Sequence, residues 1–224
     1  MKLTNRLHYL ASLVNKDAIL VDVGCDHGYL PLYLLKNNII KKAYALDINQ
    51  GPLDNVKANA IKYGLDKEIT CLLSDGLDKV RNYDFNSIVI AGMGATLIIE
   101  ILGKNLDLLG NKQLVLQANV NNYALRKWLI GNNFMITNEL LVKDDEIIYQ
   151  IIEAKQGESS NYNELELSYG RQNINENNFL LLEIMNDDLK KYQSIIKQIP
   201  NDSNKYHLFK NRIELIRGYL DETR

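Results

Sequence analysis

Up to about residue 155, short apolar runs alternate with segments of helical periodicity. The apolar runs have the length of β-strands and occupy residues 18–24, 42–48, 69–75, 87–92, 113–118, 135–142 and 147–154. Between the first five runs, apolar residues recur at helical spacing over residues 30–36, 52–63, 77–81 and 95–102. Strands that are buried on both faces are nearly continuously apolar, so the alternation predicts a parallel sheet covered by helices on both sides.

The last two runs are separated only by the polar stretch at residues 143–146. This link is too short for the crossover that parallel neighbours need, so we expect an antiparallel hairpin here. The predicted fold class is therefore α/β, with a Rossmann-like sheet that is parallel except for its antiparallel final hairpin.

The pattern changes after Gln156, where the polar sequence GESSNYNE begins. Beyond it, apolar residues recur at spacings of three and four along two stretches, as in the seam of a coiled coil. This pattern predicts an antiparallel two-helix coiled coil, and two ordinary helices packed against the sheet are the alternative. We therefore predict two domains, residues 1–157 and residues 158–224. The seam residues, spaced by three and four, are Leu182, Met185, Leu189, Tyr192, Ile196 and Ile199, then Phe209, Ile213, Ile216 and Leu220.

The composition is that of a globular protein: 224 residues, 46% hydrophobic and 24% charged. The formal net charge is −2, so a nucleic acid would have to bind a local basic face. No apolar run approaches the roughly 20 residues of a membrane span, and we expect no secretory signal. Cys25 and Cys71 form no CxxC pair. This excludes a disulfide framework or a zinc site, so we expect no metal and a cytoplasmic location.

Candidate chemistry begins where the first run ends, in the sequence VDVGCDHGYLP. Gly24 and Gly28 suit a sharp strand-to-helix turn at which a nucleotide-like ligand approaches bare backbone. The GxGxxG pattern of dinucleotide sites is absent, and Asp26 would repel the diphosphate of NAD. S-adenosylmethionine carries a sulfonium and an ammonium instead, and both attract a carboxylate.

Two further acids end the second and third runs. Asp47 is placed to accept hydrogen bonds from the ribose hydroxyls, and Asp75 to accept one from the amino group of an adenine. A single acid at a strand end is more often a turn or cap residue. Together with the glycine turn, however, the acids resemble class I S-adenosylmethionine-dependent methyltransferases. The resemblance implies cofactor contacts from Asp22, Gly24, Asp26, His27, Gly28, Asp47, Ile48, Asp75, Gly76, Gly92, Met93 and Gly94.

The end of the fourth run, AGMGA, narrows the chemistry by what it lacks. It has no Asn/Asp-Pro-Pro-aromatic sequence, which is usual in enzymes that methylate exocyclic amino groups. It also has no cysteine after a proline, which methylation of a pyrimidine carbon requires. The Gly92-Met93-Gly94 turn leaves open space and backbone N–H groups instead.

The motifs VDVGCDHGYLP, IAGMGA, LVLQAN, LRKWL and EIIYQI together resemble the bacterial TrmK family. This resemblance implies a tRNA methyltransferase that acts on ring nitrogen N1 of the adenosine at tRNA position 22. It also implies an appended C-terminal coiled coil. One departure is Ala95, where the family often has the last glycine of GMGG.

Adenine N1 has a free lone pair, so the reaction needs no general base, but the base must leave its stack to expose the Watson–Crick edge. Tyr29 is the candidate aromatic platform, or it packs over its own helix. Asp26 is the candidate for holding the adenine amino group or the methionine ammonium. His27 either contacts the donor or makes a structural hydrogen bond.

The RNA contacts are the least specific part of the prediction. Phosphate partners are expected among Arg6, Lys41, Lys42, Arg126, Lys127 and Lys143, each of which could also be a solvated surface charge. The helix pair could hold the body of the tRNA, and its hairpin favours a monomer. The alternatives are methylation of a small molecule or a protein, and a degenerate fold that only binds partners. The intact Asp22, Gly24, Asp47 and Asp75 argue against the degenerate fold.

Overall fold

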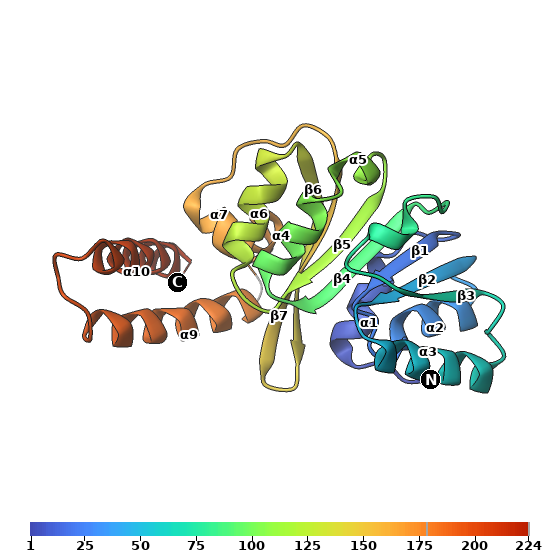
Figure 1. Ribbon diagram of the computed structural model, residues 1–224. Helices are drawn as coiled ribbons and strands as arrows, with labels where there is room; N and C mark the ends of the chain where they lie inside the picture. The colour runs from blue at the N-terminus through green and yellow to red at the C-terminus, as the bar shows by residue number, and fades with distance from the viewer. Residues whose placement is uncertain (178, 224) are drawn as a thin grey trace. The chain divides into compact units, whose positions relative to one another are not determined.

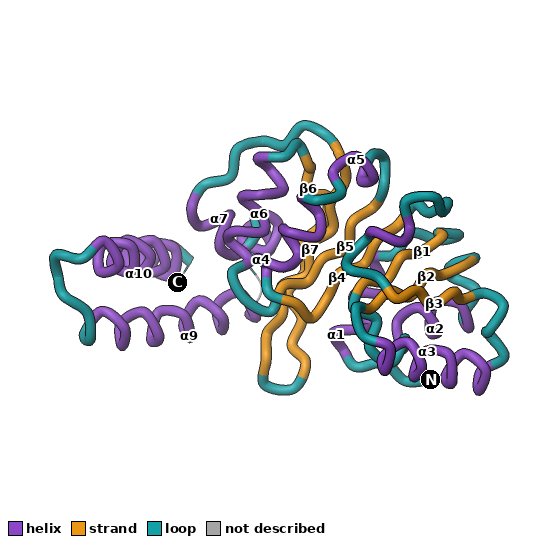
Figure 2. Tube along the Cα trace, in the orientation of Figure 1, coloured by secondary structure: helices purple, strands orange, loops and turns teal. Residues whose placement is uncertain are grey.

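The computed structural model describes residues 1–177 and 179–223 (Figures 1 and 2). Asn178, which lies within the predicted second domain, and Arg224 are outside the described residues. The chain divides into two compact units, Met1–Asn161 and Tyr162–Arg224. The predicted boundary after residue 157 lies a few residues earlier, in the same stretch without regular structure.

The first unit is built on one seven-stranded sheet in the order β3-β2-β1-β4-β5-β7-β6. Strands β1 to β5 are parallel, and β7 is antiparallel to both β5 and β6. The predicted α/β class and its antiparallel final hairpin are therefore confirmed. The strands are β1 (Ile19–Val23), β2 (Lys42–Asp47), β3 (Ile69–Leu73), β4 (Ser87–Met93), β5 (Gln113–Ala118), β6 (Phe134–Asp144) and β7 (Ile147–Gln156).

The two faces of the sheet carry separate hydrophobic cores, because successive side chains of a strand point to opposite faces. Val21 and Val23 of β1 belong to one core, and Leu20 belongs to the other. Helices α1 (Asn5–Leu13), α2 (Tyr29–Lys36) and α3 (Gln50–Tyr63) contribute to the core of Leu20. The 3₁₀ turn η1 (Asp78–Val80) and helices α4 (Ala95–Gly103), α5 (Leu106–Leu109) and α6 (Asn122–Gly131) contribute to the other. Apolar residues are needed on both sides, which explains the near-continuous apolar runs.

The second unit contains four helices among its described residues: α7 (Glu164–Tyr169), α8 (Arg171–Glu176), α9 (Phe179–Ile196) and α10 (Asn204–Glu222). The long helices α9 and α10 contact each other, as the seam predicts. Met185, Ile213 and Ile216 of that seam are buried, and the rings of Tyr192 and Phe209 lie 5.2 Å apart.

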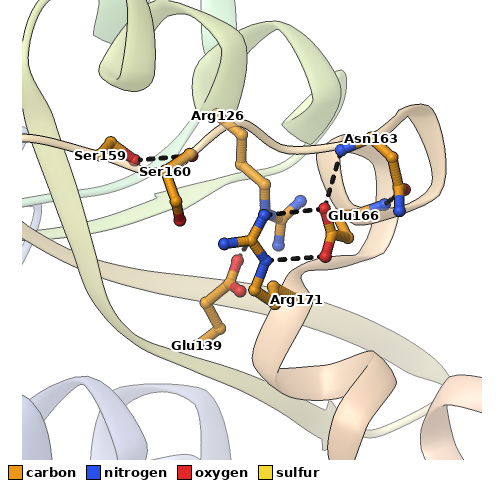
Figure 3. Close-up of polar contacts among 7 residues, drawn as sticks. All are labelled: Arg126, Glu139, Ser159, Ser160, Asn163, Glu166 and Arg171. Carbon is orange, nitrogen blue, oxygen red and sulfur yellow. Dashed lines mark hydrogen bonds and ion pairs between the residues drawn. The ribbon is translucent and has the colours of Figure 1, made fainter.

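The periodicity did not predict α7 and α8, because each spans less than two turns. Their local signal is a capping box at the start of α7 (Figure 3). The side chain of Asn163 accepts from the N–H of Glu166, and a Glu166 carboxylate oxygen accepts from the N–H of Asn163. Arg171 at the start of α8 then donates to both oxygens of Glu166. None of the helices within the described residues combines the length and apolar character needed to cross a membrane.

Candidate functional site

A cavity of about 260 Å³ opens at the carboxyl edge of the sheet. It brings together α1, the loop between β1 and α2, and the end of β4. An open α/β sheet binds its ligands at this edge. The lining residues are Arg6, Leu7, Asp22, Gly24, Cys25, Asp26, His27, Tyr29, Leu30, Ala91 and Gly92.

The β1–α2 loop turns sharply through backbone conformations that favour glycine. Gly24 and Gly28 have φ values of +74° and +68°, and Asp26 between them has φ +47°. A Cβ on Gly24 would collide with the Cε of Met93, and one on Gly28 would lie 2.8 Å from a methyl of Val56. Both glycines are therefore required by the turn and by close packing. The loop stays open on its ligand side.

Asp22 places a buried carboxyl group in this cavity. Its side chain is 6% exposed, and burial, followed by repulsion from Asp47, raises its pKa to about 7. Among the described residues, no cation forms an ion pair with it. A buried acid without a cationic partner matches a ligand that brings its own positive charge, as S-adenosylmethionine does.

The remaining acids predicted to bind the donor lie outside the cavity lining, on the neighbouring strand ends. Asp47 is the last residue of β2, and its Oδ1 accepts from the N–H of Asn49 at 2.9 Å. Ile48 beside it is 65% exposed. Asp75 is exposed after β3, and Gly76 has φ +54°. Since β1, β2 and β3 are parallel neighbours, these residues continue the edge along which a nucleoside would lie.

Asp26, His27 and Tyr29 form an exposed group at the mouth of the cavity. The rings of His27 and Tyr29 stack with centroids 5.3 Å apart and planes 20° apart. His27 Nε2 lies 3.5 Å from Asp26 Oδ1. Tyr29 is 43% exposed, so its ring is available to a ligand rather than buried over its helix.

The end of β4 carries a bulge that is held by two side chains of the β5 edge. The β4–β5 register shifts between Ala91 and Met93, which leaves Gly92 out of the ladder with φ +78°. The N–H of Gly92 donates to Gln117 Oε1 at 3.1 Å, and its carbonyl accepts from Asn119 Nδ2 at 2.7 Å. Met93 then reaches toward Gly24, and Gly94 precedes α4.

Sequence reasoning did not single out Gln117 and Asn119. Gln117 is fully buried and donates through Nε2 to Asn119 Oδ1 at 3.0 Å. The available signal was a glutamine near the end of the otherwise apolar run QLVLQA. A buried amide needs partners, and here those partners are at the ligand edge.

The predicted RNA contacts fall at different edges of the first unit. Arg6 lines the cavity. Lys143 lies near the β6–β7 turn, which is at the same edge because β7 runs antiparallel to β5. Lys41 and Lys42 lie at the amino end of β2, the opposite edge of the sheet. Lys127 on α6 is exposed, with its Nζ 5.7 Å from the ring centroid of Tyr123.

The prediction for Arg126 is wrong. Its side chain is fully buried, and its Nε lies 2.6 Å from Oε1 of Glu139, which is itself buried (Figure 3). A guanidinium in that position cannot reach an RNA phosphate. One residue along a helix is a rotation of about 100°, so Lys127 faces solvent while Arg126 faces the core.

The chain is similar to tRNA methyltransferases in both sequence and fold. The TrmK family model, described as tRNA (adenine(22)-N(1))-methyltransferase, matches residues 20–218. The tRNA (adenine(22)-N(1))-methyltransferase of Bacillus subtilis strain 168 is 31% identical to this chain, and the match covers 99% of this chain and 98% of the Bacillus protein.

Two solved structures extend the likeness to the whole fold. M. capricolum TrmK in complex with S-adenosyl-homocysteine is 34% identical, with a TM-score of 0.90 and coverage of 100% of both chains. Streptococcus pneumoniae Sp1610 in complex with S-adenosyl-L-methionine is 29% identical, with a TM-score of 0.90 over 98% of this chain and 100% of that one. On the strength of the family model and the full-length relative, the chain belongs to the TrmK family of tRNA (adenine(22)-N(1))-methyltransferases.

Proposed function

We propose that the cavity beside Asp22 and Gly92 is where this family member carries out methylation of N1 of adenosine 22 in tRNA. S-adenosylmethionine, when bound, supplies the methyl group as an electrophile on a sulfonium. The observation that carries the assignment is the buried Asp22 carboxyl, which has no cationic partner among the described residues and lies beside an open glycine turn.

The chain's own residues then have three tasks in this proposal. Asp22 attracts the cationic methionine end of the donor, and Asp47 accepts the ribose hydroxyls one strand further along the sheet. Ile48, Asp75 and Gly76 continue the adenosine side. Gly24, Gly28, Gly92, Met93 and Gly94 keep the backbone close to the donor without side chains in the way.

The target base requires alignment rather than proton removal. Neutral adenine N1 attacks with its lone pair, and the methylated base becomes cationic, so nearby carboxylates favour the product charge. We propose that the base leaves its stack and lies against Tyr29, whose other partner is the ring of His27. Asp26 is then placed to accept a hydrogen bond from the adenine amino group or from the methionine ammonium.

The activity itself is tested with tRNA that lacks modification and a donor carrying a labelled methyl group. We expect one methyl per tRNA molecule and a reverse-transcription stop at position 22, because N1 methylation blocks base pairing. A tRNA in which adenosine 22 is replaced by guanosine is the control. Incorporation into that control, or into small molecules or protein but not tRNA, would refute the assignment.

Replacing Asp47 by Ala is expected to weaken S-adenosylhomocysteine binding by about 1–3 kcal/mol, because the charged acceptor for the ribose hydroxyls is lost. Isothermal titration measures the change. Asp54→Ala is the matched control, since it removes an exposed acid of α3 that lies 3.7 Å from Lys57. Equal affinity of the Asp47 variant and the parent would mean that the ribose binds elsewhere.

We propose that the α9–α10 helix pair, within the proposed domain of residues 158–224, holds the body of the tRNA. Its surface carries exposed cations, including Lys197 and Lys205 on either side of the interhelical turn. An RNA clamp predicts that Lys197→Glu with Lys205→Glu lowers tRNA affinity at least tenfold and reduces its salt dependence. Binding of S-adenosylhomocysteine should be unchanged.

The control is the pair Lys197→Arg with Lys205→Arg, which keeps both charges. Affinities are measured by filter binding at several salt concentrations. If the glutamate pair binds tRNA as tightly as the arginine pair, these cations are only solvated surface charges.

We further propose that the protein is a monomer, because α9 and α10 bury their apolar seam against each other within one chain. We also propose that it acts in the cytoplasm, where a tRNA substrate is found.

A further inference from the structure

The guanidinium of Arg6 is held beside the Gly92 bulge by contacts from two strands. Its Nη1 donates to Gln117 Oε1 at 2.8 Å and lies 3.6 Å from where a Cβ of Gly92 would stand. Its Cζ lies 5.3 Å from the ring centroid of Tyr149 on β7. The side chain is therefore fixed from β5 on one side and from β7 on the other.

The start of α1 is tied to the same region, which supports this placement. The N–H of Asn5 donates to Asp144 Oδ1 at 3.2 Å, and Asn5 Nδ2 donates to the carbonyl of Lys143 at 3.3 Å. Both partners lie at the end of β6, near the hairpin turn. Residue 6 is thus anchored through its neighbour as well as through its own side chain.

Arg6 keeps its charge available. Within the described part of the chain it forms no ion pair, although Asp22 and Asp26 line the same cavity. One of its five N–H groups donates to Gln117, and the other four have no acceptor among the described residues. By contrast, the buried Arg126 is neutralised by Glu139. A fixed guanidinium with free donors at the rim of a cavity is suited to an oxyanion.

We propose that Gln117 is a positioning residue that presents Arg6 as the oxyanion receptor of the active site. The inference rests on the proposed function and extends it to two residues with distinct roles. The oxyanion is a phosphate of the tRNA or the carboxylate of the methyl donor, which share the geometry that a guanidinium recognises.

An amide is the side chain that can make all of these contacts at once. Gln117 Oε1 accepts from both Arg6 and Gly92, while its Nε2 donates to Asn119. Methionine has a similar length but no strong acceptor. Glutamate keeps the acceptor for Arg6 and Gly92, but it loses the donor to Asn119 and adds a buried negative charge that would pair with the guanidinium of Arg6.

The same strand offers a matched control at its other end. Gln113 is also buried, and its Oε1 accepts from the N–H of Asn15 and from Ser87 Oγ. Its Nε2 donates to the carbonyl of Leu13 and to Glu153. Gln113→Met therefore removes a comparable buried network at the amino edge, away from the cavity, and reports the purely structural cost.

The experiment compares Gln117→Met, Gln117→Glu, Gln113→Met, Arg6→Met and the double variant Arg6→Met/Gln117→Met in the full chain. Each is assayed for kcat and KM with unmodified tRNA, for S-adenosylhomocysteine affinity and for melting temperature. We expect Gln117→Met to lower kcat/KM at least tenfold because Arg6 is no longer held, and Gln117→Glu to lower it at least tenfold because the carboxylate pairs with the Arg6 charge. Gln113→Met should stay within threefold of the parent. The double variant should be within threefold of Arg6→Met, because Gln117 acts through Arg6.

The tRNA kinetics and the S-adenosylhomocysteine affinity of Arg6→Met together identify the oxyanion. If Arg6→Met raises the KM for tRNA and leaves S-adenosylhomocysteine affinity unchanged, the receptor binds phosphate. If it weakens S-adenosylhomocysteine at least tenfold, the receptor binds the donor carboxylate. Multiplicative losses in the double variant, equal losses in the two Gln→Met variants, or unimpaired turnover in Arg6→Met would overturn the inference.

Two safeguards keep the outcome decisive. If Gln117→Met does not fold, Gln117→Glu decides: turnover within threefold of the parent, despite a carboxylate beside Arg6, would refute the role of an unpaired guanidinium held by residue 117. If the parent protein does not methylate tRNA, the proposed function fails before any variant is compared, so the two failures are distinguishable.

Discussion

Replacing Arg126 by Met is expected to lower the free energy of unfolding of the first unit by about 3–5 kcal/mol. The substitution leaves the carboxylate of Glu139, which is 1% exposed, without its buried cation. An uncompensated charge in the interior costs far more than the loss of a surface ion pair. Urea unfolding monitored by Trp128 fluorescence measures the effect, because Trp128 is the only tryptophan and lies on the same helix.

Two controls separate the buried charge from other consequences of the change. Lys127→Met alters the adjacent, exposed residue and should stay within about 0.5 kcal/mol of the parent. The double variant Arg126→Met/Glu139→Leu removes both charges and should be at least ~2 kcal/mol more stable than Arg126→Met alone. If the double variant is no more stable than the single one, the destabilisation comes from lost packing and not from the stranded carboxylate.

Donor binding is expected to tighten as the pH rises from 6 to 8, through the carboxyl group of Asp22. Burial, followed by repulsion from Asp47, raises the pKa of Asp22 to about 7, from an ordinary value of 3.8. The methionine end of the donor carries an ammonium and favours the ionised carboxylate. Binding therefore releases a proton below pH 7, and affinity rises by up to roughly tenfold per pH unit there.

The same group makes the ligand-free protein less stable at higher pH. The folded protein keeps the Asp22 proton up to about pH 7, whereas the unfolded chain loses it near pH 3.8. The free energy of unfolding should thus fall between about pH 4 and pH 7, by up to roughly 4 kcal/mol, and stay low above that range.

Asp22→Asn tests both consequences, because asparagine is uncharged and nearly isosteric. At pH 8 the variant should be more stable than the parent without ligand, and it should bind S-adenosylhomocysteine at least tenfold more weakly. Its affinity should lose most of the pH dependence. His27→Gln, which changes another side chain of the same cavity, is the control and should keep the dependence. Loss of the dependence in His27→Gln would contradict the assignment to Asp22.

Much of the fold follows from local patterns that a single sequence displays. Each of the seven apolar runs became a strand, and the four-residue link at 143–146 marked the antiparallel hairpin. Such runs are predictable because strands that pack on the core carry mostly apolar side chains, with few polar positions such as Asp22 and Gln117. The α9–α10 contact was predictable for the related reason that a spacing of three and four puts one apolar stripe on each helix.

The candidate site was predictable only where the chain itself brings residues together. Gly24, Asp26 and His27 lie in one loop, Tyr29 begins the helix that follows it, and all four line one cavity. The place of Asp22 at the end of the first strand could be predicted, but its raised pKa could not. The pKa depends on burial by other parts of the fold and on Asp47 of a neighbouring strand.

Spacing along the chain could not reveal which polar residues meet across the sheet. Arg6 and Gln117 are 111 positions apart, and only the strand order β1-β4-β5-β7 puts α1, the Gly92 bulge and Tyr149 around one guanidinium. Likewise, Arg126 and Lys127 are equivalent by charge, and one rotation of α6 buries the first against Glu139 while the second stays in solvent. Residue type and periodicity thus determined the elements and the glycine loop, because those depend on neighbours in sequence. The partners of each charged or amide side chain were decided by the tertiary structure, because hydrogen bonds and desolvation depend on neighbours in space.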